Sequence, residues 1–163
     1  MMTKKGFTLV ELMIVLAIIG IVVAMSLFGL QKARENTRDA KRKSDLESVR
    51  SALELYKADN GGYPGTGGTT VFWQLTNGNA VGKALIGVGG TSLSYIATIP
   101  QDPRDSGANI LCDTGDTNFG YEYASDTLKY ITRTKMENQS SSNCPLVQYG
   151  CSSWTACYLV TQP

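Results

Sequence analysis

Lys4-Lys5-Gly6-Phe7-Thr8-Leu9-Val10-Glu11 opens the chain's most distinctive stretch, and an apolar run from Leu12 to Leu30 follows it without a charged residue. At about 1.5 Å per residue this run spans about 28 Å as a helix, close to the ~30 Å hydrocarbon core of a bilayer. Leu12 to Leu30, extended by Phe7 to Val10, therefore predicts a membrane-spanning segment. A charge inside such a helix costs roughly 2.5–3.5 kcal/mol, so Glu11 needs a partner.

Three interpretations of this segment compete. A cleaved secretory signal has a shorter apolar region of roughly 7–15 residues and a cleavage site after it. Here the run is longer, and residues 33–57 continue as a strong helix former. A plain single-span anchor explains the run, but it does not explain the position of Glu11.

The third interpretation is cleavage between Gly6 and Phe7. This cut would create a positive amine one helical turn before Glu11, because residues four apart share a helix face. The amine, from the same chain or from a neighbour, could neutralise the buried carboxylate and set the axial register between subunits.

The stretch Lys5-Gly6-Phe7-Thr8-Leu9-Val10-Glu11 resembles the prepilin-type cleavage and methylation motif of type IV pilins and type II secretion pseudopilins. The resemblance implies that a membrane prepilin peptidase cuts after Gly6 and N-methylates Phe7. It also implies that Glu11 guides assembly into a helical filament, together with an inner-membrane assembly platform. Many members of the family have a proline late in the apolar run, where this chain has Phe28-Gly29.

The orientation in the membrane depends on this resemblance. Basic residues are more numerous on the C-terminal side of the apolar run than on the side of Lys4 and Lys5, which by itself would place the C-terminal side inside. The second basic group is interleaved with acidic residues on a continuing helix, and the processing motif requires the N-terminus inside. We therefore expect the N-terminus inside.

An amphipathic helix is predicted beyond the apolar run. Leu46, Val49, Leu53 and Tyr56 recur at helical spacing and predict the helix face that covers a core. Two pairs of opposite charges lie four residues apart, Asp39 with Lys43 and Arg50 with Glu54, and are expected to pair on the helix surface. Asn60-Gly61-Gly62 ends the helix.

The remainder predicts a small globular head. Residues 80–88 are expected to form a second helix, and residues 71–75 a short helix or strand. Alternating apolar residues in 119–124 and 128–134, separated by Asp126-Thr127, predict a hairpin, and 154–160 predict a last strand. The expected fold is α+β, with a long N-terminal helix packed against a small antiparallel sheet.

Four segments are expected: a leader (1–6), a membrane or filament-core helix (7–30), an amphipathic helix entering the head (31–60), and a head with a loop-rich, cysteine-containing C-terminus (61–163). The similarity to the family covers about Lys4 to Pro64. A weaker similarity to major pseudopilins follows at Ile99-Pro100-Gln101-Asp102-Pro103 and Tyr121-Glu122-Tyr123.

The four cysteines are Cys112, Cys144, Cys151 and Cys157. Their spacing contains no Cys-x-x-Cys and the chain contains no histidine, so disulfides in an exported head are favoured over a zinc site. Three connectivities are open, and Cys112–Cys144 with Cys151–Cys157 is our first choice.

A calcium site in the head is a weaker hypothesis. Acidic and amide side chains gather between the Ile99–Pro103 turn and the following strand: Asp102, Asp105, Asp113, Asp116 and Asn118. Calcium prefers such oxygen ligands, and calcium binding in a head loop is implied by the resemblance to major pseudopilins. The spacing does not match an EF-hand, however, and loop aspartates commonly cap turns. No other cofactor is expected.

The composition argues against an enzyme. A Ser-His-Asp triad is impossible without histidine, and Gly87-Val88-Gly89-Gly90 lacks the lysine of a phosphate-binding loop. The net charge of +1 gives no argument for nucleic-acid binding.

The expected function is that of a structural subunit that forms a homopolymer through its N-terminal helix. It first lies in membrane lipid as a single-pass protein and then forms an extracellular or periplasmic filament. Three alternatives remain: a major pseudopilin of a type II secretion system, an anchored adhesion or binding module that never polymerises, and, least favoured, an exported enzyme with a retained anchor.

Overall fold

The computed structural model describes residues 6–88, 93–105, 119–143 and 157–161. The chain divides into two compact units, Met1–Thr37 and Arg38–Pro163. One helix, α1 (Leu9–Asn60), contributes to both units, and its 52 residues match the long helix expected from the sequence. The first unit contains the apolar part of α1, and the second contains the head.

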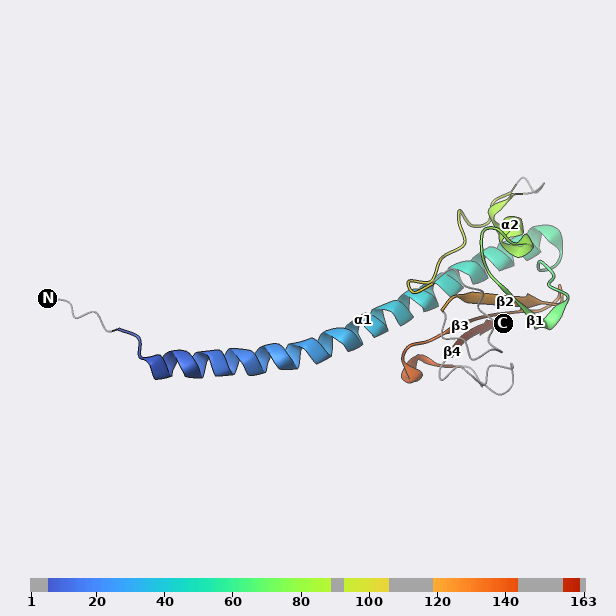
Figure 1. Ribbon diagram of the computed structural model, residues 1–163. Helices are drawn as coiled ribbons and strands as arrows, with labels where there is room; N and C mark the ends of the chain where they lie inside the picture. Colours follow the sequence, from blue (N-terminus) through green and yellow to red (C-terminus); the bar gives the residue numbers. More distant parts are fainter. Residues whose placement is uncertain (1–5, 89–92, 106–118, 144–156, 162–163) are drawn as a thin grey trace. The chain divides into compact units, whose positions relative to one another are not determined.

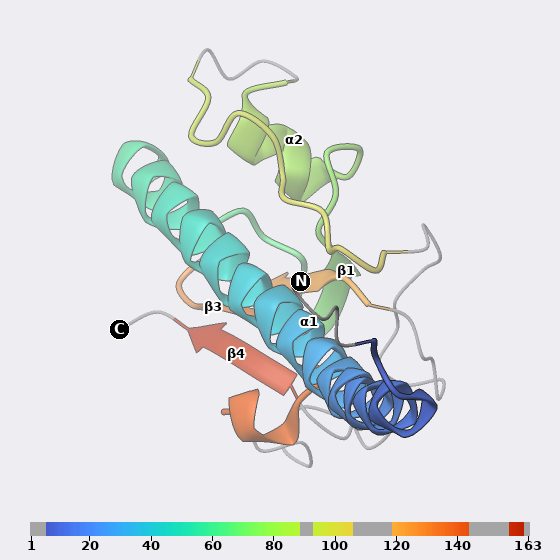
Figure 2. The same ribbon diagram turned by 90° about the vertical axis from the view of Figure 1, so that its left-hand side faces the viewer.

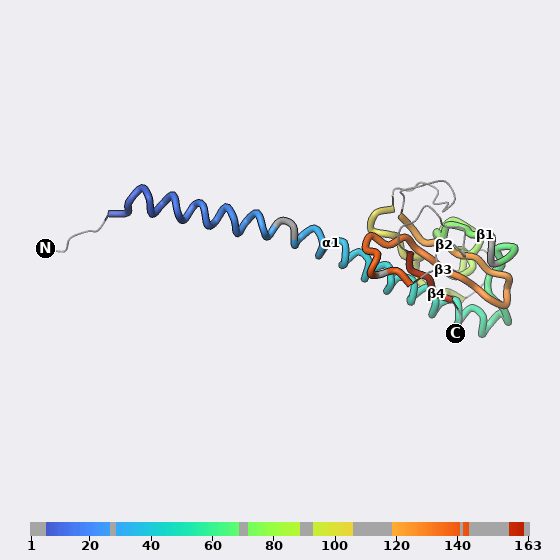
Figure 3. The backbone as a smooth tube through the Cα atoms, turned by 90° about the horizontal axis from the view of Figure 1, so that it is seen from below, coloured from blue at the N-terminus to red at the C-terminus, as the bar shows by residue number. Residues whose placement is uncertain are grey.

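The head is built on a four-stranded antiparallel sheet with the order β1-β2-β3-β4. Its strands are β1 (Gly68–Gln74), β2 (Tyr121–Ser125), β3 (Tyr130–Lys135) and β4 (Cys157–Thr161). Figure 3 shows the four strands side by side in chain order. The predicted hairpin is confirmed: β2 pairs with β3 from Tyr121 opposite Thr134 to Ser125 opposite Tyr130.

Two side chains hold the turn of this hairpin, and one of them is Ser125, whose hydroxyl accepts the N–H of Thr127 (3.0 Å). The carboxylate of Asp126 accepts hydrogen bonds from the backbone N–H groups of Leu128 (3.1 Å) and Lys129 (2.8 Å). Thr127 has a φ of 76°, which is the left-handed conformation. Aspartate at the start of a turn commonly binds the backbone in this way, which explains why Asp126-Thr127 marked the turn in the sequence.

Two short helices complete the described part of the head. The predicted second helix is α2 (Ala80–Ile86), and its N-cap is Asn79, whose side chain accepts the N–H of Gly82. It ends at Gly87, whose φ of 77° is the left-handed conformation typical of a helix C-terminus. The other is a 3₁₀ turn, η1 (Gln139–Ser141), between β3 and β4.

The C-terminal part of α1 covers one face of the sheet (Figures 1 and 2). Leu46, Val49 and Leu53 are fully buried, as the apolar stripe predicted. They pack in one core with residues from the sheet, from α2 and from the loops: Tyr63, Leu75, Val81, Leu85, Ile99, Tyr121, Tyr123, Tyr130 and Val160. Each buried leucine or valine contributes about 1.5–3 kcal/mol relative to an exposed one, so this face of α1 fixes the helix to the head.

Tyrosines in the core keep their hydroxyl groups bonded. Tyr121 donates to Asp45 (2.6 Å), Tyr123 donates to the carbonyl of Pro64 (2.8 Å), and Tyr63 donates to Glu54 (3.0 Å). Burial raises the pKa of Tyr121, and the neighbouring carboxylate of Asp45 raises it further. With its pKa raised, Tyr121 stays neutral. The hydrogen bonds of the three hydroxyl groups compensate for the loss of water around them on burial.

Candidate functional site

The apolar part of α1 exposes its side chains on every side. From Phe7 to Leu30, every residue whose side chain the structure describes is exposed. The most hydrophobic 18-residue window of α1 has a mean hydropathy of 2.8, and by length and composition this helix could cross a membrane. A helix that is apolar on all sides is not stable when it is exposed to water. Lipid or other helices must therefore cover it.

The helix begins two residues after the predicted cleavage point. The N–H of Glu11 donates to the hydroxyl of Thr8, and the N–H of Leu12 donates to the carbonyl of Thr8, both at 3.3 Å. Thr8 is therefore the N-cap of α1. Gly6 and Phe7 precede the helix and are exposed, so the Gly6–Phe7 bond lies outside α1, where a protease can reach it.

Thr8 has a role that the sequence analysis did not identify. Thr8-Leu9-Val10-Glu11 has the Thr-x-x-Glu spacing of a capping box, and this signal was available in the sequence. Glu11 lies in the first turn of α1, where the helix dipole favours a negative charge.

The carboxylate of Glu11 has no hydrogen-bond donor in the part of the chain that the structure describes. It is exposed, like the apolar side chains around it. Once lipid or neighbouring helices exclude water, the dipole alone, worth about 0.3–1 kcal/mol, does not offset the cost of a buried charge. In such surroundings the carboxylate must either take up a proton or pair with a cation from outside the described residues.

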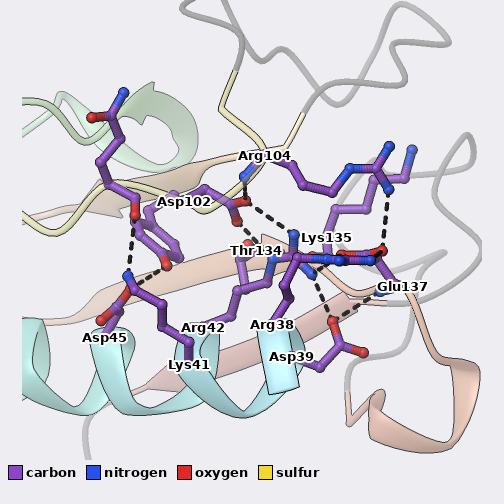
Figure 4. A network of polar contacts seen from close by, with 12 residues as sticks. Arg38, Asp39, Lys41, Arg42, Asp45, Asp102, Arg104, Thr134, Lys135 and Glu137 are labelled. Carbon is purple, nitrogen blue, oxygen red and sulfur yellow. Dashed lines mark hydrogen bonds and ion pairs between the residues drawn. The ribbon is translucent and has the colours of Figure 1, made fainter. Parts of the chain in front are cut away.

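A second group of charged residues lies in the head around the buried side chain of Arg42 (Figure 4). We call it the Arg42 cluster, and its members are Arg38, Asp39, Arg42, Asp102, Arg104 and Glu137. Arg42 donates to Asp102 through Nε (2.7 Å) and Nη2 (3.0 Å), and through Nη1 to Asp39 (2.7 Å) and Glu137 (2.9 Å). The guanidinium is fully buried and also lies 4.4 Å from the centre of the Phe119 ring.

The cluster joins three segments that are distant in the sequence. Asp39 and Arg42 belong to α1, and Glu137 follows β3. Asp102 belongs to the segment Pro100–Pro103 between α2 and β2, which we call the Pro100–Pro103 turn. The carboxylate of Asp39 accepts the backbone N–H groups of Glu137 (3.1 Å) and Asn138 (2.9 Å), which fixes the chain after β3 to the helix.

Each buried ion of the cluster stays charged because groups of opposite charge bond it. Burial by itself would lower the pKa of Arg42, but the hydrogen bonds and charge of Asp102, with those of Glu137 and Asp39, outweigh burial and raise it. Hydrogen bonds from Arg38 lower the pKa of Glu137 to about 2, and Arg42 adds to this effect against desolvation.

Of the predicted calcium ligands, Asp102 and Asp105 lie in the described residues, whereas Asp113, Asp116 and Asn118 lie outside them. Both carboxylate oxygens of Asp102 accept hydrogen bonds from Arg42, and one also accepts the N–H of Arg104 at 2.8 Å. Within the described ranges, no three His, Cys, Asp or Glu residues are grouped so that they could hold a metal ion. Calcium binding stays a prediction.

Only one of the four cysteines, Cys157, lies in the described residues. It is 2% exposed at the start of β4 and is disulfide-bonded. Its partner lies outside the described residues, so the expected pairing of Cys112 with Cys144 and of Cys151 with Cys157 stays a prediction.

The expected surface ion pairs on α1 are wrong. Asp39 pairs with Arg42 rather than Lys43, whose ammonium lies 5.2 Å from the centre of the Tyr158 ring. Arg50 pairs with Glu47 (3.5 Å), while Glu54 accepts the hydroxyl of Tyr63. These two ion pairs on α1 thus form between residues three apart, and groups outside the helix also bond Asp39 and Glu54.

Comparison with known proteins adds independent evidence. Residues 1–27 match the family model described as the prokaryotic N-terminal methylation motif. The chain is 31% identical over 112 residues to the type II secretion system core protein G of Klebsiella pneumoniae, which covers 68% of this chain and 76% of that protein. It is also 31% identical over 134 residues to the fimbrial protein EcpC of Eikenella corrodens, covering 78% of this chain and 88% of that protein.

Other matches are shorter. The type II secretion system core protein G of Pectobacterium carotovorum is 40% identical over 63 residues, which is 39% of this chain and 40% of that protein. No solved structure matches significantly. The two longer matches and the methylation motif together show that the chain belongs to the family of type IV pilins and type II secretion pseudopilins.

Proposed function

We propose that this protein is a structural subunit of a type IV pilus-like filament, processed after Gly6 and polymerised through the apolar part of α1. One observation carries the proposal: between Leu9 and Leu30 the helix exposes an apolar surface on all sides, with Glu11 as its single charged residue. A surface of this kind can be buried first in lipid and then among copies of the same helix.

The cut after Gly6 supplies the cation that Glu11 needs. Cleavage leaves an amine on Phe7, one residue before the N-cap Thr8 and four residues before Glu11. In a bundle of such helices, the amine of one subunit pairs with the Glu11 carboxylate of the same chain or of a neighbour. An unpaired carboxylate there costs several kcal/mol, so the pairing favours one axial register between subunits.

The protein is membrane-anchored before assembly, with its N-terminus inside in our proposal. A prepilin peptidase then removes residues 1–6, and an assembly platform in the membrane moves the subunit from lipid into the filament. The head remains outside the membrane, where the expected disulfides are stable. The role is mechanical and associative, and it requires no catalytic group.

The second candidate is a major pseudopilin of a type II secretion system. The observation that favours it is the match to the type II secretion core protein G of several species. The match to fimbrial protein EcpC covers more of this chain and favours the pilus. Both candidates share the processing and packing of α1, and they differ in whether the polymer extends from the cell surface.

Polymerisation is tested by replacing Glu11. The Glu11→Ala variant should insert into the membrane at the wild-type level, while the sheared filament fraction, seen by immunoelectron microscopy, falls at least tenfold. The control is Glu47→Ala, which removes an exposed acidic residue from the head part of the same helix. Normal filaments from the Glu11 variant would refute the pairing role. A wild-type chain that stays monomeric beside a working assembly machine would favour the anchored binding module.

A further inference from the structure

The Arg42 cluster lies at the point where a load on the apolar helix enters the head. α1 is continuous from Leu9 to Asn60, and the head unit begins at Arg38. Along α1 from its start, Asp39 and Arg42 are the first buried residues whose side chains the structure describes. A pull on the N-terminal helix is therefore resisted first by the cluster and only afterwards by the apolar core at Leu46.

We propose that the Arg42 cluster is a force clamp, which locks α1 to the head against tension along the helix. The use of such a clamp rests on the proposed function, because a filament subunit is held in the polymer by its N-terminal helix while its head bears external load. The clamp itself is a property of the single chain, so it can be measured without any filament.

The bonding pattern suits this role. Arg42 donates four hydrogen bonds to three carboxylates, which come from α1, from the Pro100–Pro103 turn and from the segment after β3. Hydrogen bonds are directional and weaken steeply with displacement, whereas apolar contacts are non-directional. Movement of Arg42 along the helix axis must break its bonds to Asp102 and Glu137 together. These are the bonds that connect the turn and the segment after β3 to α1.

Because the Arg42 cluster is buried at its centre, breaking only some of its hydrogen bonds is energetically unfavourable. The side chains of Arg42, Asp39 and Asp102 are at most 1% exposed, so in the folded head these three groups bond one another and not bulk water. A buried ion that loses its partner is strongly destabilised. Arg38 and Arg104 close the outer side of the cluster by bonding Glu137 at 2.5 Å and 3.1 Å. The cluster therefore opens as a unit, which is the behaviour that a clamp requires.

The head contains a matched control. Arg133 and Glu122 form a second buried ion pair at 2.5 Å, and the Arg133 guanidinium lies 3.4 Å from the centre of the Phe72 ring. This pair joins β2 to β3 and contains no residue of α1. Loss of either arginine should lower the equilibrium stability of the head, but only the loss of Arg42 should change the resistance to a pull on α1.

The test is single-molecule pulling of the full chain, held in a detergent micelle, with handles at both termini. At a fixed load, Arg42→Met and Asp102→Asn should each unfold at least tenfold faster than the wild-type head. Arg133→Met should unfold within twofold of the wild type, even where chemical denaturation shows a loss of stability comparable to that of Arg42→Met.

Equal unfolding rates under load for Arg42→Met and Arg133→Met would overturn the clamp, and so would an unchanged rate for Asp102→Asn. The Asp102 variant keeps the side-chain shape and decides the question if Arg42→Met does not fold. A failed clamp would leave the filament proposal intact, because the Glu11 experiment does not depend on the cluster. Failure of polymerisation in that experiment would equally leave the pulling result unchanged.

Discussion

Arg42 and Asp102 lie sixty residues apart in the sequence and are joined by two hydrogen bonds of 2.7 Å and 3.0 Å between fully buried side chains. This contact fixes the Pro100–Pro103 turn to α1, the helix that carries the apolar segment. The head is thus attached to its helix by a buried charge cluster as well as by an apolar core.

Replacement of Arg42 should destabilise the head severely. Arg42→Met leaves three carboxylates without their shared cation, and breaking a buried pair in this way costs about 3–5 kcal/mol. The exposed control is Arg50→Met on the same helix, which loses a 3.5 Å surface contact with Glu47 and should cost less than about 1 kcal/mol. Chemical denaturation followed by near-UV circular dichroism measures both variants, and equal losses would contradict the account.

The stability of the head should depend on pH in the acid range through Glu137. Its pKa is lowered from an ordinary value of 4.5 to about 2 in the folded protein. A lowered folded-state pKa gives stability that is present above pH 4.5 and is lost as the pH falls towards 2. Glu137→Gln should flatten the plot of unfolding free energy against pH over this window. A wild-type curve as flat as that of the variant would show that Glu137 is not held by the arginines.

These results show which parts of the head could be predicted from the sequence. Leu46, Val49 and Leu53 repeat at helical spacing, and the hairpin has its turn residue Asp126 between two alternating strands, so local pattern was sufficient. Arg42 could not be placed in this way, because its burial depends on Asp102 and Glu137, which come from other segments. Sequence spacing favoured Lys43 as the partner of Asp39, whereas the fold brings Arg42 and the backbone after β3 to this carboxylate.

In the N-terminal site, unlike the Arg42 cluster, local sequence pattern was sufficient to find the motif. The motif that contains Gly6, Phe7 and Glu11 could be recognised from the sequence, because its spacing is itself the signal and no tertiary contact is needed. The roles assigned to these three residues stay predictions. The N-cap role of Thr8 could also be predicted from the sequence, because its spacing to Glu11 is that of a capping box. The described residues give the Glu11 carboxylate no donor, because the cation proposed for it is an amine that exists only after cleavage.

Gly82→Ala should destabilise α2, although alanine normally favours a helix by about 1 kcal/mol over glycine. A Cβ at Gly82 would lie 1.8 Å from the carbonyl oxygen of Thr76, so the backbone before α2 must move. The movement would disturb Asn79, the N-cap that accepts the N–H of Gly82. Thermal unfolding should show a lower midpoint for this variant. A midpoint at or above that of the wild type would mean that the Thr76 segment yields without cost.

Peptide mapping without reduction should find two disulfides, Cys112–Cys144 and Cys151–Cys157. Cys157 lies in β4, which pairs with β3, so its disulfide attaches the segment of its partner cysteine to the sheet. Mass spectrometry of the unreduced digest identifies the linked peptides. A peptide linking Cys157 to Cys144 or Cys112 would contradict the proposed connectivity.

The mature N-terminus tests the central claim most directly. The protein should be purified from its own membranes, and its N-terminal peptide should be identified by mass spectrometry. The account predicts a chain that begins at Phe7 and carries an N-methyl group, which would establish processing by a prepilin peptidase. A chain that still begins at Met1 or Met2 would contradict it and would leave α1 as a simple membrane anchor.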